Sequence, residues 1–443
     1  MQNQTEINRL KQVVQQLLDD AKQQGATAAE AAFTIDNGLS VSARLGEVET
    51  VEYHCDQGIG ITVYFGQKKG SASTNDISPD SLTETVKAAC SIASYASADD
   101  YAGLPDPELL ATEFPDLDLF HPWDLNAEQA IELAIACENA ARSYHPAISN
   151  SEGASVNSHH GIRVFGNSQG FLQGSQSSRH SLSCSVLAGV GENMQRDYWY
   201  SVARNPAMLE SVQQVGEKAA QRTVARLNAR SLSTRQCPVL FAPEMASGLI
   251  GALIGAISGG SLYRKASFLL DSLDTQVMPE FVRIHEQPAL KGALGSANYD
   301  GEGVATQTHD IVSNGILKSY VLSTYSARKL GLRSTGNAGG VHNLTVEPGD
   351  NDFAAMLKLL DTGLLVTELM GQGINRVTGD YSRGAAGFWV ENGVIQYPVQ
   401  EITIAGNLKT MLRNLVAIGN DMDLRGNTRV GSILLEKMAI AGE

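Results

Sequence analysis

The chain has 443 residues, a formal net charge of −15 at pH 7, 43% hydrophobic residues and 18% charged residues. It is long enough for two domains with apolar cores of their own, and its composition excludes a disordered or fibrous protein. Lysines and arginines are scattered, so the negative charge disfavours direct binding to nucleic acid, whose phosphates such a surface repels.

The cysteines and the N-terminus predict a cytoplasmic protein. The five cysteines are isolated and odd in number, which favours free thiols and argues against both a disulfide framework and a structural zinc site. The first ten residues lack the basic start and apolar core of a signal peptide. We therefore expect a protein of the cytoplasm without a membrane partner.

Residues 1–230 are expected to form an N-terminal α+β domain. An amphipathic helix is predicted between Thr5, a possible N-cap, and Gly25. Asp36-Asn37-Gly38 is typical of a hairpin turn, because Asn and Gly accept positive φ. The strands expected in this half are 31–35, 39–44, 48–55, 59–65, 155–164, 170–176, 181–188 and 197–204.

Three further helices are predicted in this half. Ser78-Pro79 opens one that runs to about residue 95, Asn126 caps one that runs to about residue 144, and Asn205-Pro206 opens one that runs to about residue 228. A proline-containing loop joins the first two of them. The order helix, four strands, helix thus appears in 5–96 and again in 126–229, which indicates a possible internal duplication.

Residues 231–235 form the expected domain boundary, and 236–443 the C-terminal domain. This half is predicted to be rich in strands, with hairpin turns at Ser313-Asn314-Gly315 and Glu391-Asn392-Gly393. We expect a barrel-like or strongly curved antiparallel sheet wrapped on a central helix. The fold class is therefore α+β with two domains.

The central helix is predicted from the stretch 239–265. A short apolar strand precedes Pro243, which suits a first helical turn, and no charge occurs from Met245 to Leu262. Gly251, Gly255 and Gly259 recur every four residues, so they share one helix face that allows close approach of another backbone. A buried core helix is the simplest interpretation; a membrane span and a helix that carries a site remain open.

Three long stretches resemble the TldD/PmbA family, known as modulators of DNA gyrase, and within it the PmbA (TldE) branch. They are STYSARKLGLRSTGNAGGVHNLTV (323–346), GLLVTELMGQGINRVTGDYSRGAAGFWVENG (363–393) and EITIAGNLKTMLRN (401–414). The resemblance covers essentially the whole chain. It implies a subunit of a cytosolic metallopeptidase that degrades unstructured peptides and processes precursor peptides.

The resemblance also implies that this chain lacks the metal ligands. In the TldD branch the central helix carries an HExxxH motif shortly before an Arg-Lys pair. With Arg264 and Lys265 as the anchor, Gly251 and Ala252 fall in the first His-Glu positions and Ala256 in the second His position. The segment 421–436 has no cysteine for the family's remaining ligand. A metal, zinc in expectation, would then belong to a TldD-like partner, and this chain would be a non-catalytic subunit of a heterodimer.

Two glycine-rich segments are the candidates for a substrate groove. They contribute the residues Gly339, Gly340, His342, Asn343, Asp380, Ser382 and Arg383. His342, Asp380 and Ser382 are also the residue types of a hydrolytic triad, although no GxSxG motif occurs here. His159, His160, His285 and His309 lack the spacing of a metal motif, and Gly371 to Ile374 lack the full dinucleotide fingerprint.

Two other functions remain open from sequence. The chain could be a binding protein that modulates DNA gyrase or another client without proteolysis. It could also act as an independent hydrolase through the possible triad. A homodimer is possible when the partner is missing.

Overall fold

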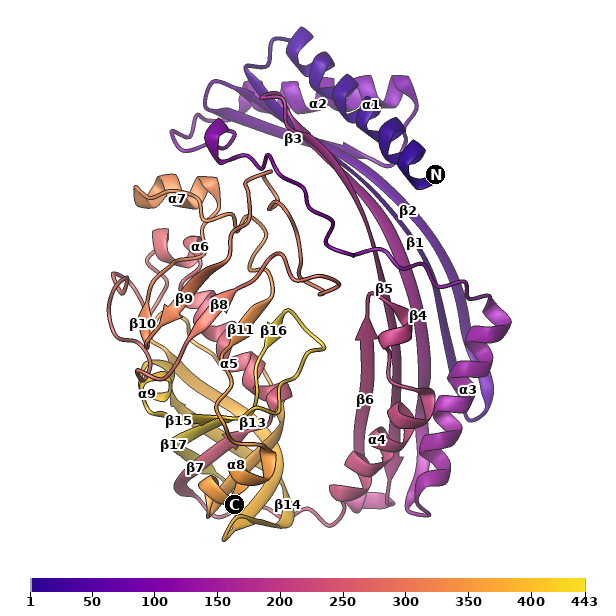
Figure 1. Cartoon of the computed structure of the whole chain (residues 1–443), viewed down its shortest axis with the longest axis vertical. Coiled ribbons are helices and arrows are strands. Elements are labelled where there is room, and N and C mark those ends of the chain that lie inside the picture. The colour runs from indigo at the N-terminus through magenta and orange to yellow at the C-terminus, as the bar shows by residue number, and fades with distance from the viewer. Residues whose placement is uncertain (1, 443) are drawn as a thin grey trace.

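A six-stranded antiparallel sheet forms the first half of the protein, whose computed structural model describes residues 2–442. The strand order is β3-β2-β1-β4-β5-β6. The sheet curves around the second half of the chain (Figure 1). Its strands are β1 (Ala28–Arg44), β2 (Glu47–Phe65), β3 (Lys68–Thr74), β4 (Ile148–Asn167), β5 (Leu172–Ala188) and β6 (Gln195–Ala203).

Helices cover the outer face of this sheet. They are α1 (Gln2–Gln23), α2 (Pro79–Tyr95), α3 (Ala127–Tyr144) and α4 (Val212–Ala225). In α1, residues at helical spacing such as Leu10, Val14 and Leu17 are buried, and the helix packs against β1 and β4. The helix starts predicted at Ser78 and Asn126 are confirmed, since each side chain accepts a hydrogen bond from the first turn.

The predicted hairpin at Asp36–Gly38 is wrong. β1 runs unbroken through it, because Asn37 lies opposite one residue of β2 and one of β4, and a turn would break both ladders. The chain reverses instead at Leu45 and Gly46, which adopt φ of 54° and 81°. Their N–H groups donate to the buried carboxylate of Glu138 at 2.7 and 2.8 Å, which fixes this turn against α3.

The order helix, three strands, helix occurs twice in the first half, where the sequence indicated four strands each time. The count differs because β1, β2 and β5 each join two of the predicted strands, and because β3 is an additional strand that was not predicted. The last helix also begins later than predicted. Asn205-Pro206 opens only the 3-10 turn Pro206–Met208, and Ser211 caps α4 through Gln214.

The second half is built on a barrel. Its sheet has the order β14-β13-β12-β7-β17-β15, and an additional pairing between β14 and β17 closes five strands on themselves. The expected barrel is therefore present, but β7 and β12 run parallel where an antiparallel sheet was predicted. The strands are β7 (Arg235–Phe241), β12 (Gly363–Met370), β13 (Asp380–Glu391), β14 (Val394–Asn407), β15 (Leu415–Ile418) and β17 (Ile433–Ala441).

A smaller sheet and short helices complete this half. The sheet has the order β10-β9-β8-β11-β16, with β8 (Ile284–Glu286), β9 (His309–Ser313), β10 (Ile316–Leu317), β11 (Leu344–Val346) and β16 (Thr428–Arg429). The helices are α7 (Thr324–Leu330), α8 (Phe353–Leu360) and α9 (Leu408–Arg413). The predicted turns at Asn314-Gly315 and Asn392-Gly393 are confirmed, with positive φ at all four residues.

The central helix is shorter than predicted and breaks in two. α5 (Pro243–Ala256) packs its apolar face into the core with β7 and β12, and α6 (Gly259–Tyr263) follows. The break occurs where Val321 N donates to Ile257 O at 3.1 Å and Gly259 N donates to Val321 O at 2.8 Å. These bonds form a β-bridge between Ser258 and Val321, and the helix ends there because the backbone at Ser258 is extended. No helix among residues 2–442 has the length and apolar character that a membrane crossing requires.

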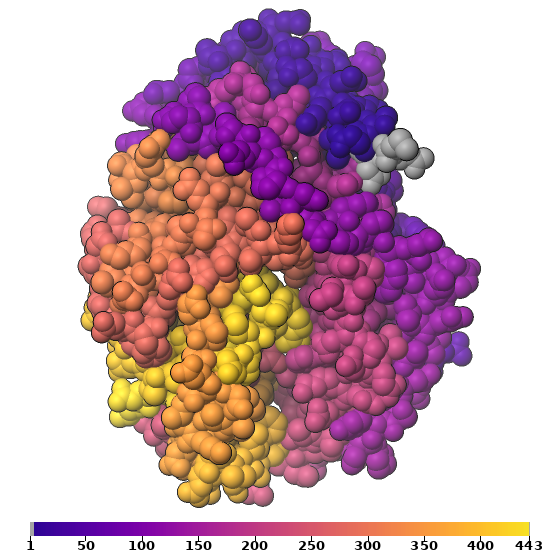
Figure 2. All heavy atoms as spheres, in the orientation of Figure 1, coloured from indigo at the N-terminus to yellow at the C-terminus, as the bar shows by residue number. Residues whose placement is uncertain are grey.

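The two halves lie side by side along most of their length (Figure 2). The segment between α2 and α3 crosses the second half, where Ala111 N donates to Gly303 O at 3.0 Å and Gly292 N donates to Leu117 O at 2.8 Å. β6, the last strand of the curved sheet, faces the second half across a cavity.

Candidate functional site

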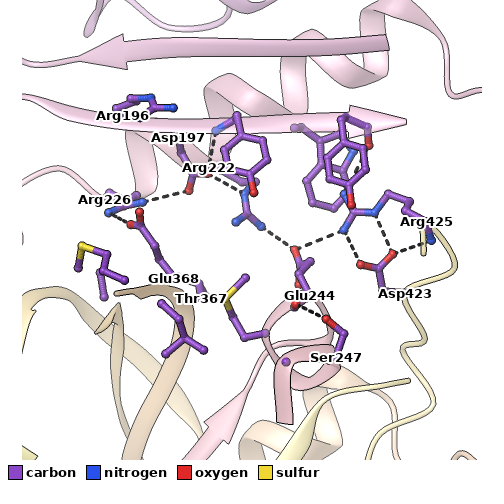
Figure 3. A pocket seen from close by; sticks show the side chains of 18 of the residues that line it. Arg196, Asp197, Arg222, Arg226, Glu244, Ser247, Thr367, Glu368, Asp423 and Arg425 are labelled. Carbon is purple, nitrogen blue, oxygen red and sulfur yellow. Dashed lines mark hydrogen bonds and ion pairs between the residues drawn. The ribbon is translucent and has the colours of Figure 1, made fainter. Parts of the chain in front are cut away.

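A cavity of about 710 Å³ lies between the two halves. Residues of β6 and α4 form its wall on the first half. The start of α5, the end of β12 and residues 423–428 form its wall on the second half (Figure 3). Both walls come from elements that the barrel and the curved sheet hold in place.

Ion pairs cross this cavity. Arg222 on α4 lies 3.3 Å from a carboxylate oxygen of Asp197 on β6 and 2.9 Å from one of Glu244 on α5. Arg226, the residue directly after α4, pairs with Asp197 at 3.5 Å and with Glu368 on β12 (Figure 3). Asp197 is only 7% exposed, so removal of its arginines would leave a buried charge without a partner.

Arg425 closes another side of the cavity. Its guanidinium carbon lies 3.7 Å from the centre of the Trp199 ring and 4.6 Å from that of Tyr200. Asp423 accepts two hydrogen bonds from the same guanidinium, at 2.9 and 3.0 Å. Burial raises the pKa of the Tyr200 hydroxyl, which therefore keeps its proton at neutral pH.

Two strand edges face the cavity. β6 is the last strand of its sheet, and residues 196–200 line the cavity. β12 pairs with β7 only from Leu364 to Val366, so residues 367–370 continue past β7 and line the cavity as well. A strand edge offers N–H and C=O groups to an extended peptide, whatever the peptide's sequence.

His342 belongs to a different cluster. Its Nδ1 lies 2.9 Å from Glu286, a buried carboxylate that also accepts from the His342 backbone and from Asn337 Nδ2 at 2.9 and 3.0 Å. Asn343 is buried and donates to Ser296 Oγ at 2.7 Å. Gly339 and Gly340 have positive φ and open space around them. The histidine is thus fixed by Glu286 within the smaller sheet.

The other candidate residues begin β13 in the barrel. Asp380 is exposed and accepts from Thr378 Oγ1 at 2.6 Å and from Asn407 Nδ2 at 3.2 Å. Ser382 donates its backbone N–H to Gly373 O at 2.7 Å, and the buried Nε of Arg383 has no hydrogen-bond acceptor among the described residues. Within residues 2–442, His342 shares no hydrogen bond with Asp380 or Ser382, so the structure does not assemble the triad considered from sequence.

The other histidines considered from sequence, His160 beside Phe120 among them, lie in ion pairs or ring contacts. His159 stacks on His54 with ring centres 5.1 Å apart and lies 3.3 Å from Asp36. His285 pairs with Glu347 at 3.3 Å, and His309 lies 3.7 Å from Glu286.

Family models cover most of the chain. Residues 234–442 match the PmbA/TldA metallopeptidase C-terminal domain, residues 120–227 the central domain and residues 29–93 domain 1. The chain belongs to the PmbA/TldD family. It is 54% identical to the protein named Metalloprotease PmbA of Escherichia coli O157:H7, over 94% of this chain and 92% of that relative.

Solved structures share the fold of this PmbA/TldD chain. A putative modulator of DNA gyrase from Bacteroides thetaiotaomicron matches with a TM-score of 0.93 and 29% identity, over 98% of this chain and 99% of that one. TldE from Thermococcus kodakarensis matches in fold with a TM-score of 0.86 and 21% identity, over 97% of this chain and all of that one.

The family description implies a metal, but the residues on α5 do not fit one. Gly251 is exposed with open space where a side chain would begin, and Ala252 and Ala256 are buried. Glu244, the carboxylate of this helix, is engaged by Arg222 and Arg425. Across residues 2–442 no group of three or more His, Cys, Asp or Glu side chains is arranged to hold a metal ion.

Sequence reasoning missed the residues that build the PmbA/TldD cavity. Asp197, Arg222, Glu244, Glu368 and Arg425 lie far apart in the chain and carry no shared motif. The one local signal was the aromatic run Tyr198-Trp199-Tyr200, and all three of these residues line the cavity.

Proposed function

We propose that this chain is the PmbA/TldE-like, non-catalytic subunit of a cytoplasmic metallopeptidase that degrades unstructured peptides and processes precursor peptides. A homologous TldD-like subunit would supply the metal and the hydrolytic chemistry. The observation that carries this proposal is the exposed face of α5, where Gly248 lines the cavity and Gly251, the position at which the resemblance places a metal ligand, has open space around it.

This chain's own part is to hold the peptide. The edges of β6 and β12 bind the backbone of an extended substrate, which explains tolerance for peptide sequence. The small residues Gly248 and Gly251 leave room for that backbone beside α5. The arginine and carboxylate pairs keep the two walls at a fixed separation.

A bulky residue at Gly248 tests this role. Gly248 lines the cavity, is exposed, and has no atom near the position of a Cβ. Gly248→Trp should lower cleavage of an unstructured peptide by the reconstituted pair by about tenfold or more, because the peptide is displaced from its reactive position. Ala136→Trp, on the exposed face of α3, is the matched control and should leave cleavage unchanged.

Unchanged cleavage by Gly248→Trp would contradict a peptide-holding role for this cavity. If the chain then still bound a client such as gyrase without the TldD-like subunit, it would be a binding protein outside proteolysis.

A further inference from the structure

The outer edge of β2 is open over residues 47–57. β3 pairs with β2 only from Ile59 to Phe65, and residues 47–57 pair on their inner side with β1. Within the described chain, no other element exchanges backbone hydrogen bonds with this segment. Roughly half of the N–H and C=O groups of an edge strand point away from its sheet. This segment therefore presents a row of free backbone groups.

The matching edge in the second repeat, that of β5, makes a contact with the connector. β6 pairs with β5 from His180 to Ala188, and beyond that point the connector between α2 and α3 takes over. Ser178 N donates to Leu119 O at 2.9 Å, and His121 N donates to Ser178 Oγ at 2.8 Å. Residues 47–57 of β2 thus lack the backbone contact that the connector makes with β5 at Ser178.

Apolar side chains accompany the open edge. Val48, Val51 and Tyr53 are 44%, 40% and 70% exposed. Val51 lies opposite Val41, and Tyr53 opposite Leu39, both of which are buried in the core beneath α3. The exposed residues therefore continue an apolar sheet face beyond the cover of the helix. Folded proteins usually block long edges of this kind because they invite pairing with another strand.

The charge on this edge selects the partner. Glu47, Glu49, Glu52 and Asp56 lie within the segment, which contains no lysine or arginine. None of the four carboxylates makes an ion pair in the part of the chain that the structure describes. A second copy would bring the same carboxylates, on a chain of net charge −15, against this edge, and like charges across strands are unfavourable.

We propose that residues 47–57 of β2 are a docking site for an extended segment of another protein that alternates lysine or arginine with apolar residues. The segment adds to the sheet as a further strand. Its backbone bonds to the open edge, its basic side chains pair with Glu49 and Glu52, and its apolar side chains pack on Val51 and Tyr53. β2 and β6 lie toward opposite edges of the sheet, so this site is separate from the cavity.

A labelled peptide of about ten residues, the length of the open edge, tests this site. The peptide alternates lysine with valine and threonine, and its binding to the full chain is followed by fluorescence anisotropy. The double variant Glu49→Lys with Glu52→Lys should bind about tenfold more weakly or worse. The matched double variant Glu113→Lys with Glu280→Lys makes the same change in net charge at exposed positions elsewhere and should bind within about twofold of wild type.

A second peptide distinguishes binding by strand addition from binding by electrostatic attraction alone. The same sequence methylated at alternate backbone nitrogens keeps its lysines but loses hydrogen-bond donors, and should not bind. Absence of wild-type binding, equal loss in both double variants, or equal binding of the methylated peptide would each overturn the proposal. So would a wild-type dimer that Tyr53→Asp dissociates in sedimentation, since the edge would then hold a second copy. Circular dichroism verifies that each variant is folded.

Discussion

Arg425 of the second half stacks on Trp199 of the first, with its guanidinium carbon 3.7 Å from the centre of the indole ring. The Trp199 Nε1 in turn donates to the Glu210 carboxylate at 3.1 and 3.2 Å. The arginine therefore lies between an aromatic face of one half and the Asp423 carboxylate of the other. This contact joins the two walls of the cavity.

Loss of the Arg425 guanidinium should loosen that junction. Arg425→Gln removes the stack on Trp199 and leaves Asp423, itself largely buried, without its cation. We expect the free energy of unfolding to fall by about 2–4 kcal/mol, measured by urea denaturation. Arg196→Gln, which removes an exposed pair with Glu152, is the control and should cost less than about 1 kcal/mol. Equal effects from the two variants would contradict this account.

Two glycines of the central stretch should respond in opposite ways to alanine. Gly251 lies inside α5 with open space around it, so Gly251→Ala should raise the free energy of unfolding by about 0.5–1 kcal/mol. At Gly259 a Cβ would meet the Oγ of Ser326, and Gly259→Ala should lower stability. Thermal unfolding of both variants tests this pair. Stabilisation by both would mean that α6 and α7 do not pack as the structure shows.

Glu286 should be needed as a carboxylate. Glu286→Gln introduces an amide donor where Asn337 and His342 already donate. We expect a loss of about 1–3 kcal/mol in the free energy of unfolding, since one buried donor is left without an acceptor. Glu347→Gln, at a more exposed carboxylate of the same sheet region, serves as the matched control. Imidazole NMR should also show a change in the His342 Nδ1 proton only in the first variant.

Asp300 should make stability depend on pH. Burial raises the pKa of this carboxyl to about 6, although the N–H groups of Ala338, Glu302 and Val304 favour the charged form. The folded state therefore favours protonated Asp300. That stabilisation is fully present below about pH 4 and is lost as the pH rises through about 6.

Asp300→Asn tests this dependence, because asparagine stays neutral. The free energy of unfolding of wild type relative to the variant should fall by roughly 3 kcal/mol between about pH 4 and about pH 7. Urea denaturation at several pH values measures the difference. A difference that does not change with pH would contradict the raised pKa of Asp300.

Asn-Gly pairs predicted turns correctly where no long-range strand pairing competed with them. Asn314-Gly315 and Asn392-Gly393 form the hairpins that their sequence indicates. Asn37-Gly38 carries the same signal but lies in a strand held on both sides. Close packing, not a turn, explains the glycine at position 38, since a Cβ there would lie 2.4 Å from the ring of His159. Long-range pairing thus outweighs the local preference for a turn.

The glycines of the central stretch lie in different environments, which their regular spacing in the sequence did not reveal. Gly251 lies on an exposed face, Gly255 lies beside the side chain of Arg376, and Gly259 packs against Ser326 across the break. The prediction that all three glycines share one face of one helix was therefore only partly right, because Gly259 lies in α6, beyond the break. The bonds from Val321 that break the helix come from a distant segment and leave no local trace in the sequence.

The cavity could not be predicted because its charges meet only in three dimensions. Arg222 belongs to the first half and Glu244 to the second, while Arg425 lies near the C-terminus. His342, by contrast, was singled out from its glycine-rich loop, but its partner Glu286 stands next to His285 in a segment that had been considered only for a metal role.

Cleavage of an unstructured peptide by the purified chain is the most direct test of the proposed function. We predict no cleavage by the chain alone, and cleavage once the metal-bearing TldD-like homologue is added. Cleavage by the chain alone would contradict a non-catalytic subunit. Its sensitivity to a chelator would then show whether the activity comes from a metal site that α5 does not provide or from a metal-free hydrolase.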